Sequence, residues 1–250
     1  MSLAATVGAC ATTERQLPPR TEAELGRQLS DELDRETFVL ADSALTAPLV
    51  SVGESLGAGA PYPIAPYSFK VVDGEAVNAF AVAGGSIYVY RGLIEESSSM
   101  GELAAVLAHE IAHLAAGHAS SKLYEYQRSQ LGLGMTVDRS RVLFLATYGR
   151  ALEAEADSIG VGLMVAAGWD PGGMLRFFEA LMELRDDRPG VLEAPFLTHP
   201  MIEERMASVR RIIDRLPAEE VSGLRESCAA YDTLIAALEE LPPPRGSEFR

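Results

Sequence analysis

Two histidines and a glutamate form a short motif that could hold a metal ion and use it. Residues 109–113 read His-Glu-Ile-Ala-His and follow the apolar run 103–108, so the two imidazoles are expected at positions i and i+4 of a helix. Side chains four apart share one face, about 5–6 Å apart at Cβ, so His109 and His113 can reach one tetrahedral zinc ion. Glu110 lies beside them, where its carboxylate can act as a general base on water. Because three of the 4 histidines cluster here, the spacing predicts a hydrolytic zinc centre rather than a buried helix with incidental histidines.

A hydrolytic zinc needs a third protein ligand and an open fourth position. A metzincin-type extension of the motif is excluded, because its glycine and third histidine would fall at Ala116 and Ala119. A second acidic cluster follows in a largely apolar surrounding, where Glu153 and Asp157 share a helical face and Glu155 points roughly the opposite way. We therefore expect Glu153 to be the third ligand and Asp157 to fix the tautomer of a ligand histidine, while Glu155 fits a solvated face.

These motifs and their surroundings resemble the gluzincin metallopeptidases related to the CAAX prenyl protease and HtpX, in particular the soluble periplasmic branch of BepA-like and LoiP-like proteins. The resemblance covers roughly residues 22–215 and rests on segments 78–80, 84–89, 91–94, 102–113, 150–157, 168–171 and 198–200. It implies that His109, His113 and Glu153 bind one zinc ion per chain and that Glu110 is the catalytic base. One departure is Ala83, which stands where a proline is usual.

His199 is the one histidine outside the 109–118 cluster, and it lies in a Phe-Leu-Thr-His-Pro segment. A histidine in such a context is often structural, but the resemblance places this segment beside the active site. His199 then either stabilises the tetrahedral oxyanion or occupies the fourth zinc position and keeps the enzyme inactive. Arg205 either stabilises the oxyanion instead or pairs with an acidic neighbour. His118 comes five residues after His113 and faces about 140° away on a continuous helix, so we expect a capping or surface role for it.

Three short β-rich runs precede the motif, at 67–72, 77–82 and 86–90, and they predict a small antiparallel sheet. By analogy with gluzincins, the run 86–90 is expected at the edge of the sheet, where an extended peptide can add to it. Substrate would then contact Gly85, Ser86, Ile87 and Tyr88. The alternative is a strand that is paired within the sheet, and Gly84 with Gly85 either allows close approach of substrate or merely forms a turn.

The other segments have helical periodicity, and a Gly/Pro-rich connector is expected at 53–66. The expected helices are 21–45, 100–119, 122–147, 151–167, 171–185, 201–214 and 219–239. The predicted fold is therefore α+β and mainly helical, a gluzincin fold with a small antiparallel sheet and an HExxH active-site helix. We expect an N-terminal tail over 1–20, a single metallopeptidase domain over 21–240 and a C-terminal tail over 241–250.

The composition and net charge of the chain indicate which classes of binding partner are disfavoured. With 250 residues, 48% of them hydrophobic, the chain can build one real core. The net charge of -15 disfavours nucleic acid and anionic membrane surfaces. No apolar run reaches the roughly 18–20 residues that a membrane-spanning helix needs.

The N-terminus carries a second signal, because Val7-Gly8-Ala9-Cys10 is similar to a lipoprotein box preceded by a trimmed leader. Cys10 is therefore either a lipid attachment site or an incidental cysteine in a disordered tail. Cys228 lies in a helix-like run and is expected to be a small buried hydrophobe.

The expected activity is zinc-dependent endopeptidase hydrolysis of unfolded or misfolded polypeptides. By resemblance, the substrates would be misfolded or misassembled bacterial envelope proteins in the periplasm. Nucleic acid is not an expected partner, and a lipid anchor at Cys10 would be the one contact with a membrane, here the outer membrane. The alternative is a zinc-bearing periplasmic chaperone or assembly factor with little proteolysis. Glu110 favours cleavage, because a protein that only holds chains needs no base beside the metal.

Overall fold

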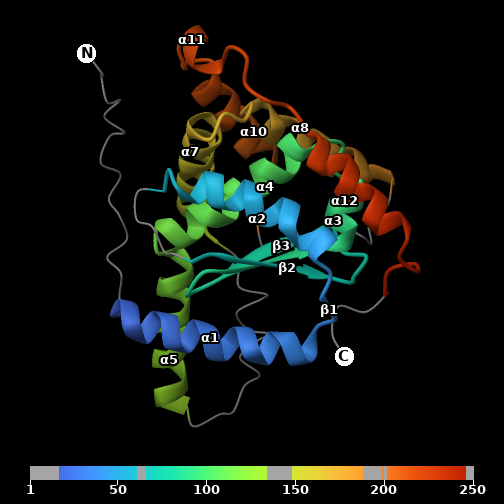
Figure 1. Cartoon of the computed structure of the whole chain (residues 1–250). Helices are drawn as coiled ribbons and strands as arrows, with labels where there is room; N and C mark the ends of the chain where they lie inside the picture. The colour runs from blue at the N-terminus through green and yellow to red at the C-terminus, as the bar shows by residue number, and fades with distance from the viewer. Residues whose placement is uncertain (1–16, 61–65, 134–147, 188–198, 200–201, 246–250) are drawn as a thin grey trace.

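The fold is a small sheet with helices on both faces (Figure 1). A computed structural model of the chain describes residues 17–60, 66–133, 148–187, 199 and 202–245, so Cys10 lies outside the described residues. The strands are β1 (Val39–Leu40), β2 (Ser68–Val72), β3 (Ala79–Val82) and β4 (Ser86–Tyr90). The described helices are α1 (Pro19–Glu36), α2 (Ser43–Gly57), α3 (Arg91–Glu96), α4 (Met100–Ala115), α5 (His118–Leu133), α7 (Arg150–Ala166), α8 (Gly172–Asp187), α10 (Ile202–Ile213), α11 (Ala218–Val221) and α12 (Ala229–Glu239). The predicted α+β, mainly helical class is confirmed.

The two faces of the sheet belong to two separate apolar clusters. Along β4, Tyr88 and Tyr90 join Leu33 of α1, whereas Ile87 and Val89 face the larger core with α2 and α4. Successive strand residues point to opposite faces, so this alternation follows from the sequence Ser-Ile-Tyr-Val-Tyr itself. The sheet thus has α1 on one face and α2 and α4 on the other, while α5 extends past the sheet toward α1 (Figure 1).

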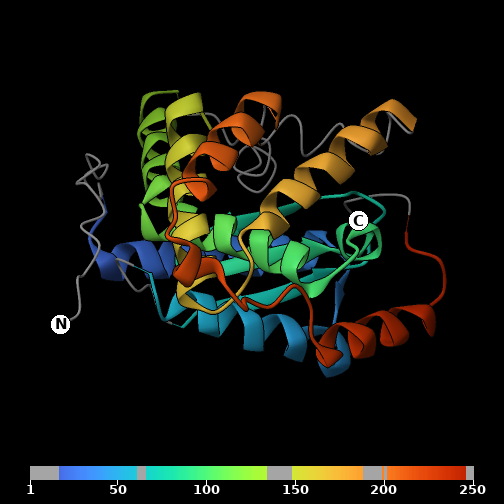
Figure 2. The same cartoon turned by 90° about the horizontal axis from the view of Figure 1, so that it is seen from above.

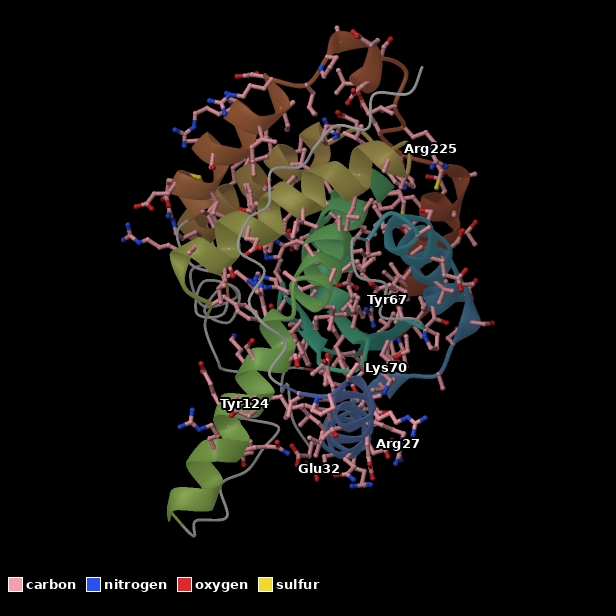
Figure 3. The ribbon with its side chains drawn as sticks, turned by 90° about the vertical axis from the view of Figure 1, so that its left-hand side faces the viewer. Arg27, Glu32, Tyr67, Lys70, Tyr124 and Arg225 are labelled. Atoms are coloured by element: carbon pink, nitrogen blue, oxygen red, sulfur yellow. The ribbon has the colours of Figure 1, made fainter. Side chains whose placement is uncertain are left out.

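A polar network fastens α1 to its face of the sheet. Lys70 Nζ lies 2.6 Å from Asp34 Oδ2, and the Tyr88 hydroxyl is 2.8 Å from both Asp34 Oδ1 and Ser30 Oγ. Figure 3 shows Lys70 beside α1. The side chain of Tyr88 therefore holds α1 in place and points away from the opposite face, where α4 packs.

The sheet is mixed, with strand order β1-β2-β4-β3. β3 and β4 form an antiparallel hairpin whose turn is made by Gly84 and Gly85, at φ 92° and 106°. β4 then inserts between β3 and β2 and runs parallel to β2, which is why the pairing is not antiparallel throughout. The expectation that 86–90 forms the edge is therefore wrong, since both sides of β4 are paired. The edge strands are β1 and β3, and β3 packs against α4.

α4 lies at the centre of the helical layer (Figure 2), in contact with α2, α7 and α8. Every residue of α4 is buried. α10 packs on α7 and α8, while α12 packs on α2 and α3. Within the described residues, no helix combines the length and the apolar character that a bilayer span requires.

Three segments differ from the sequence prediction. The expected helix 21–45 is wrong, because α1 ends at Glu36 and the strand β1, which pairs with β2, separates it from α2. α2 continues through Gly53, where a loop was expected. Gly53 allows close packing of α2 on β2, because a Cβ at this position would lie 2.0 Å from the ring of Phe69. The expected helix 219–239 is split into α11 and α12, because Arg225 pairs with the backbone of Gly168 and Asp170. Cys228 is consequently a half-buried N-cap residue of α12 rather than a buried helical residue.

Candidate metal centre

α4 carries the two motif histidines into the interior from a well-capped start. Ser99 Oγ accepts the Glu102 N–H at 3.3 Å, and Glu102 Oε2 accepts the Ser98 N–H at 2.9 Å. The helix then runs between α7, α8 and β3, so His109 and His113 are both buried. Their Nε2 atoms lie 3.0 Å apart on one face of the helix, as the i, i+4 spacing predicts.

α7 and the segment at His199 complete a cluster of donor atoms. Glu153 Oε1 lies 3.4 Å from His113 Nε2, and Glu153 Oε2 lies 3.5 Å from His109 Nε2. His199 Nδ1 is 3.0 Å from Glu153 Oε1 and 3.3 Å from His109 Nε2. One donor atom from each of these four residues lies within 4.8 Å of all the others.

The separations of these donor atoms fit a tetrahedral metal ion. Metal–ligand bonds of about 2.0–2.1 Å place neighbouring ligands of a tetrahedron roughly 3.3 Å apart. The observed contacts, which involve both oxygens of Glu153, run from 3.0 to 3.5 Å, and one donor atom from each residue lies within 4.8 Å of the other three. Imidazole nitrogens and a carboxylate are the usual ligand types of hydrolytic zinc, and here they converge in a buried position.

The second ring nitrogen of His109 is held by a carboxylate and an arginine. Asp157 Oδ1 lies 2.9 Å from His109 Nδ1, and the Arg205 guanidinium donates two hydrogen bonds, of 2.7 and 2.8 Å, to the Asp157 carboxylate. Burial favours the protonated acid, but the Arg205 guanidinium outweighs it and holds the pKa of Asp157 below its ordinary value. Arg205 Nη1 is also 2.8 Å from Glu153 Oε2. Asp157 and Arg205 thus lie directly behind the ligand atoms, in the place expected for orienting groups.

Glu110 lies beside the cluster without joining its donor set. Its side chain is buried, and Oε1 is 3.5 Å from His199 Nε2. Burial raises the pKa of Glu110, although the backbone N–H of Ala81, on the edge strand β3, donates to it and opposes that shift. Oε2 has no hydrogen-bond partner among the described residues. A buried carboxylate with a raised pKa and a free oxygen is suited to exchange protons with water.

The residues expected to bind substrate are not at this site. Ser86 and Tyr88 hydrogen-bond to Ser30 on the α1 face, and Ile87 is fully buried inside the sheet. Gly85 is in the hairpin turn. The assignment of Gly85, Ser86, Ile87 and Tyr88 to substrate therefore fails, because β4 is an interior strand.

Two cavities border β3 instead. One is lined by Ala79 together with His109 and Glu110, and the other is lined by Phe80, Ala81 and Val82 with part of α5. The unpaired side of β3 therefore lies next to the donor cluster.

Comparison with known proteins agrees with this geometry. The model of peptidase family M48 matches residues 43–213. The chain belongs to peptidase family M48. The beta-barrel assembly-enhancing protease of Escherichia coli K12 is 28% identical over 76% of this chain and 43% of its own length. Metalloprotease LoiP of the same organism is 29% identical over 79% of this chain and 81% of its own. Mitochondrial metalloendopeptidase OMA1 of Schizosaccharomyces pombe is 31% identical over 65% of this chain and 50% of its own.

The M48 chain thus spans less than half the length of the first of these relatives. Peptidases of family M48 depend on a metal, and the His-His-Glu-His cluster is the group of described residues that can hold one.

The M48 site also contains two residues whose positions the sequence reasoning misjudged. His118 is buried, with Nδ1 2.9 Å from His113 Nδ1 and Nε2 3.4 Å from Glu155 Oε2. Burial lowers the pKa of both His113 and His118, which favours the neutral form of each imidazole. His118 is therefore not a surface residue, and Glu155 is not part of a solvated face. Tyr148 stacks on His113 at a ring distance of 3.8 Å.

A glycine explains why His118 was misplaced. α4 ends at Ala115, and Gly117 has φ 78°, a conformation that glycine adopts at helix ends. α5 then begins at His118 in a new direction, which brings the imidazole back to His113. The angle of about 140° applies only to an unbroken helix. Ala116-Gly117 was the signal in the sequence that could have predicted the break.

Proposed function

We propose that residues 21–240 form a single zinc-dependent endopeptidase domain with one zinc ion, held by His109, His113 and Glu153. The observation that carries this proposal is the convergence of these three donors beside Glu110, whose Oε2 has no hydrogen-bond partner within the described part of the chain. A zinc-bearing chaperone would need the donors but not the base. The position of Glu110 therefore supports hydrolysis.

Each residue of the proposed site has its own role in peptide hydrolysis. Zinc held by His109, His113 and Glu153 would polarise the scissile carbonyl and acidify water. Glu110 takes the proton of the attacking water and passes it to the leaving amine, a task for which its raised pKa is suited. Asp157 and Arg205 orient His109 and Glu153.

His199 has two candidate roles in this proposal. Its Nδ1 lies among the donor atoms, which supports the role of a fourth ligand that closes the site at rest. Its Nε2 lies 3.5 Å from Glu110, which is also where a group that stabilises the oxyanion would be near the reacting atoms. The two roles make opposite predictions for removal of the imidazole.

An extended polypeptide fits the open edge of β3. The Asn78 carbonyl accepts from Tyr90 of β4, and Ala79 and Ala81 alternate with the residues that pair with β4, so their backbone groups face the free edge. The Ala81 N–H already donates to Glu110, so a substrate strand would pair with the backbone of Ala79 and with the Ala81 carbonyl, next to the proposed base. Backbone pairing is insensitive to side-chain identity, so an unfolded segment of any sequence can bind in this way.

We propose that the substrates are misfolded or misassembled proteins of the bacterial envelope. Two relatives named as a beta-barrel assembly-enhancing protease and as metalloprotease LoiP support this proposal. The proposed location is the periplasm, with Cys10 as a lipid anchor in the outer membrane. Triton-phase partitioning and mass spectrometry of the membrane-extracted protein would test the anchor, and a Cys10→Ser variant is its control.

Digestion of casein by the wild type and by Glu110→Gln tests the enzymatic proposal. The amide preserves shape but cannot accept the proton, so we expect zinc content near one per chain and at least a 100-fold loss of cleavage. Glu183→Gln, at an exposed position of α8, is the matched control and should cut at the wild-type rate. A Glu110→Gln protein that digests casein as fast as the wild type refutes the metallopeptidase mechanism.

A further inference from the structure

A line of three side chains leads from the donor cluster on α4 to α5 and then to α7. His113 directs Nε2 at His109 Nε2 and Glu153 Oε1, while its Nδ1 is 2.9 Å from His118 Nδ1. His118 in turn directs Nε2 at Glu155 Oε2, 3.4 Å away. These groups come from three elements, α4, α5 and α7. Burial isolates them: both imidazoles are essentially inaccessible, and the side chain of Glu155 is 14% exposed.

Only one assignment of donors and acceptors along this line is consistent with metal binding by His113 Nε2. A histidine that binds a metal through Nε2 must carry its proton on Nδ1. The His113 Nδ1–H can then donate only to an acceptor, so His118 Nδ1 must be unprotonated. A neutral His118 therefore carries its proton on Nε2, where the Glu155 carboxylate accepts it. Each bond fixes the tautomer of the next ring.

We infer that His118 and Glu155 are positioning residues, which hold His113 in the tautomer and orientation that present Nε2 to the metal. His109 receives the same support directly from the Asp157 carboxylate at 2.9 Å. Among the described residues, His113 has no carboxylate within hydrogen-bond distance of its Nδ1. His118 connects His113 to the carboxylate of Glu155 instead. Tyr148 confines the ring from its flat side, at an interplanar angle of 19°. The inference rests on the metal centre of the proposed function, not on cleavage.

Metal affinity of the full chain, measured after chelator treatment, separates this role from simple packing. Zn²⁺ would be titrated in competition with a chromophoric chelator, and the visible spectrum of the Co²⁺-loaded protein would report the ligand geometry. The variants are His118→Leu, His118→Asn and Glu155→Leu, with Glu183→Leu on α8 as an exposed control. Circular dichroism of the metal-free proteins checks that each variant folds.

The hydrogen bonds from His113 through His118 to Glu155 predict a specific order of Zn²⁺ affinities among the variants. His118→Leu leaves the His113 Nδ1–H without an acceptor, so Zn²⁺ binding should weaken by about 10- to 100-fold with an altered Co²⁺ spectrum. His118→Asn should bind more tightly than His118→Leu, because its amide oxygen can accept that proton. Glu155→Leu should weaken binding by roughly 10-fold, at the lower end of the same range, since its bond is long. Packing alone predicts the reverse order for His118, because leucine fills the space of an imidazole better than asparagine does.

Two results would overturn the inference. One is a folded His118→Leu protein with wild-type affinity or with tighter binding than His118→Asn. If His118→Leu does not fold, the second result is a Glu155→Leu protein that binds Zn²⁺ with wild-type affinity and has an unchanged Co²⁺ spectrum. Failure of the proposed function is distinguishable from both, because it would appear as a wild-type chain that binds no Zn²⁺.

Discussion

At the scale of single residues, the histidines of the cluster differ in how their second ring nitrogen is used. His109 and His113 direct Nε2 at the cluster and engage an orienting partner through Nδ1. His199 does the opposite, with Nδ1 at the cluster and Nε2 3.5 Å from Glu110 Oε1. His199 therefore contacts both the donor cluster and Glu110, the proposed base. This arrangement favours a resting site that must open before it cuts.

Replacement of His199 by alanine distinguishes its two roles. If the imidazole is a fourth ligand, His199→Ala opens a water position and should raise casein digestion or self-cleavage. If it stabilises the oxyanion, kcat should fall by roughly 100-fold with little change in zinc content. Both quantities would be measured on the same preparations, with zinc by atomic emission. Unchanged activity and zinc would assign His199 a structural role and contradict both proposals.

At the scale of elements, the sequence predicts what depends on local pattern and misses what depends on long-range pairing. The apolar run before the motif and the i, i+4 spacing of Glu153 and Asp157 predict the starts of α4 and α7 to within one residue, whereas α4 ends at Ala115 and not at the expected residue 119. The position of β4 inside the sheet is not encoded locally, because an apolar five-residue strand can be an edge or an interior strand. The contact of His118 with His113 depends on one glycine conformation, at Gly117.

The edge strand β3 gives a prediction at this scale. Ala79→Pro removes an N–H that faces the open edge, and proline is tolerated at such positions because the ladder to β4 is not touched. We expect a folded protein with wild-type zinc content and a KM for unfolded substrate raised at least several-fold. Phe80→Pro is the matched control, since residue 80 faces β4 and its change should disrupt the sheet. Cleavage by Ala79→Pro with an unchanged KM would exclude backbone pairing at β3.

At the scale of the whole molecule, the site is a buried set of ionisable groups inside a strongly acidic protein. The net charge is -15, yet Arg205 is buried among Asp157, Glu153 and His109. Removing such groups from water is costly unless they are paired or bound to a cation. Folding, protonation and metal binding are therefore coupled through the same residues, and pH should act on all three.

His109 sets the expected pH dependence. Burial and Arg205 lower the pKa of His109, but Asp157 and Glu153 outweigh them and raise it to about 9 in the metal-free protein. A raised pKa in the folded state stabilises the protein fully below the unfolded value of about 6.5, and this contribution is lost as pH rises toward 9. Metal binding must displace that proton, so affinity should change in the opposite direction.

Between pH 7 and 8, the metal-free chain should therefore lose stability, by at most about 1.4 kcal/mol per pH unit, while zinc affinity rises up to about tenfold per unit. The window begins at pH 7 because burial lowers the pKa of His113 and His118, and these two imidazoles contribute with the opposite sign near pH 6.5. It ends at pH 8 because the buried Lys122, with its pKa lowered to about 8, contributes with that opposite sign above it. Urea denaturation of chelator-treated protein and zinc competition titrations at the same pH values measure both trends. In His109→Gln the loss of stability across this window should disappear. A metal-free wild type whose stability is constant or increases across this window would show that His109 is neutral in the folded chain, and that its carboxylate partners do not hold a proton there.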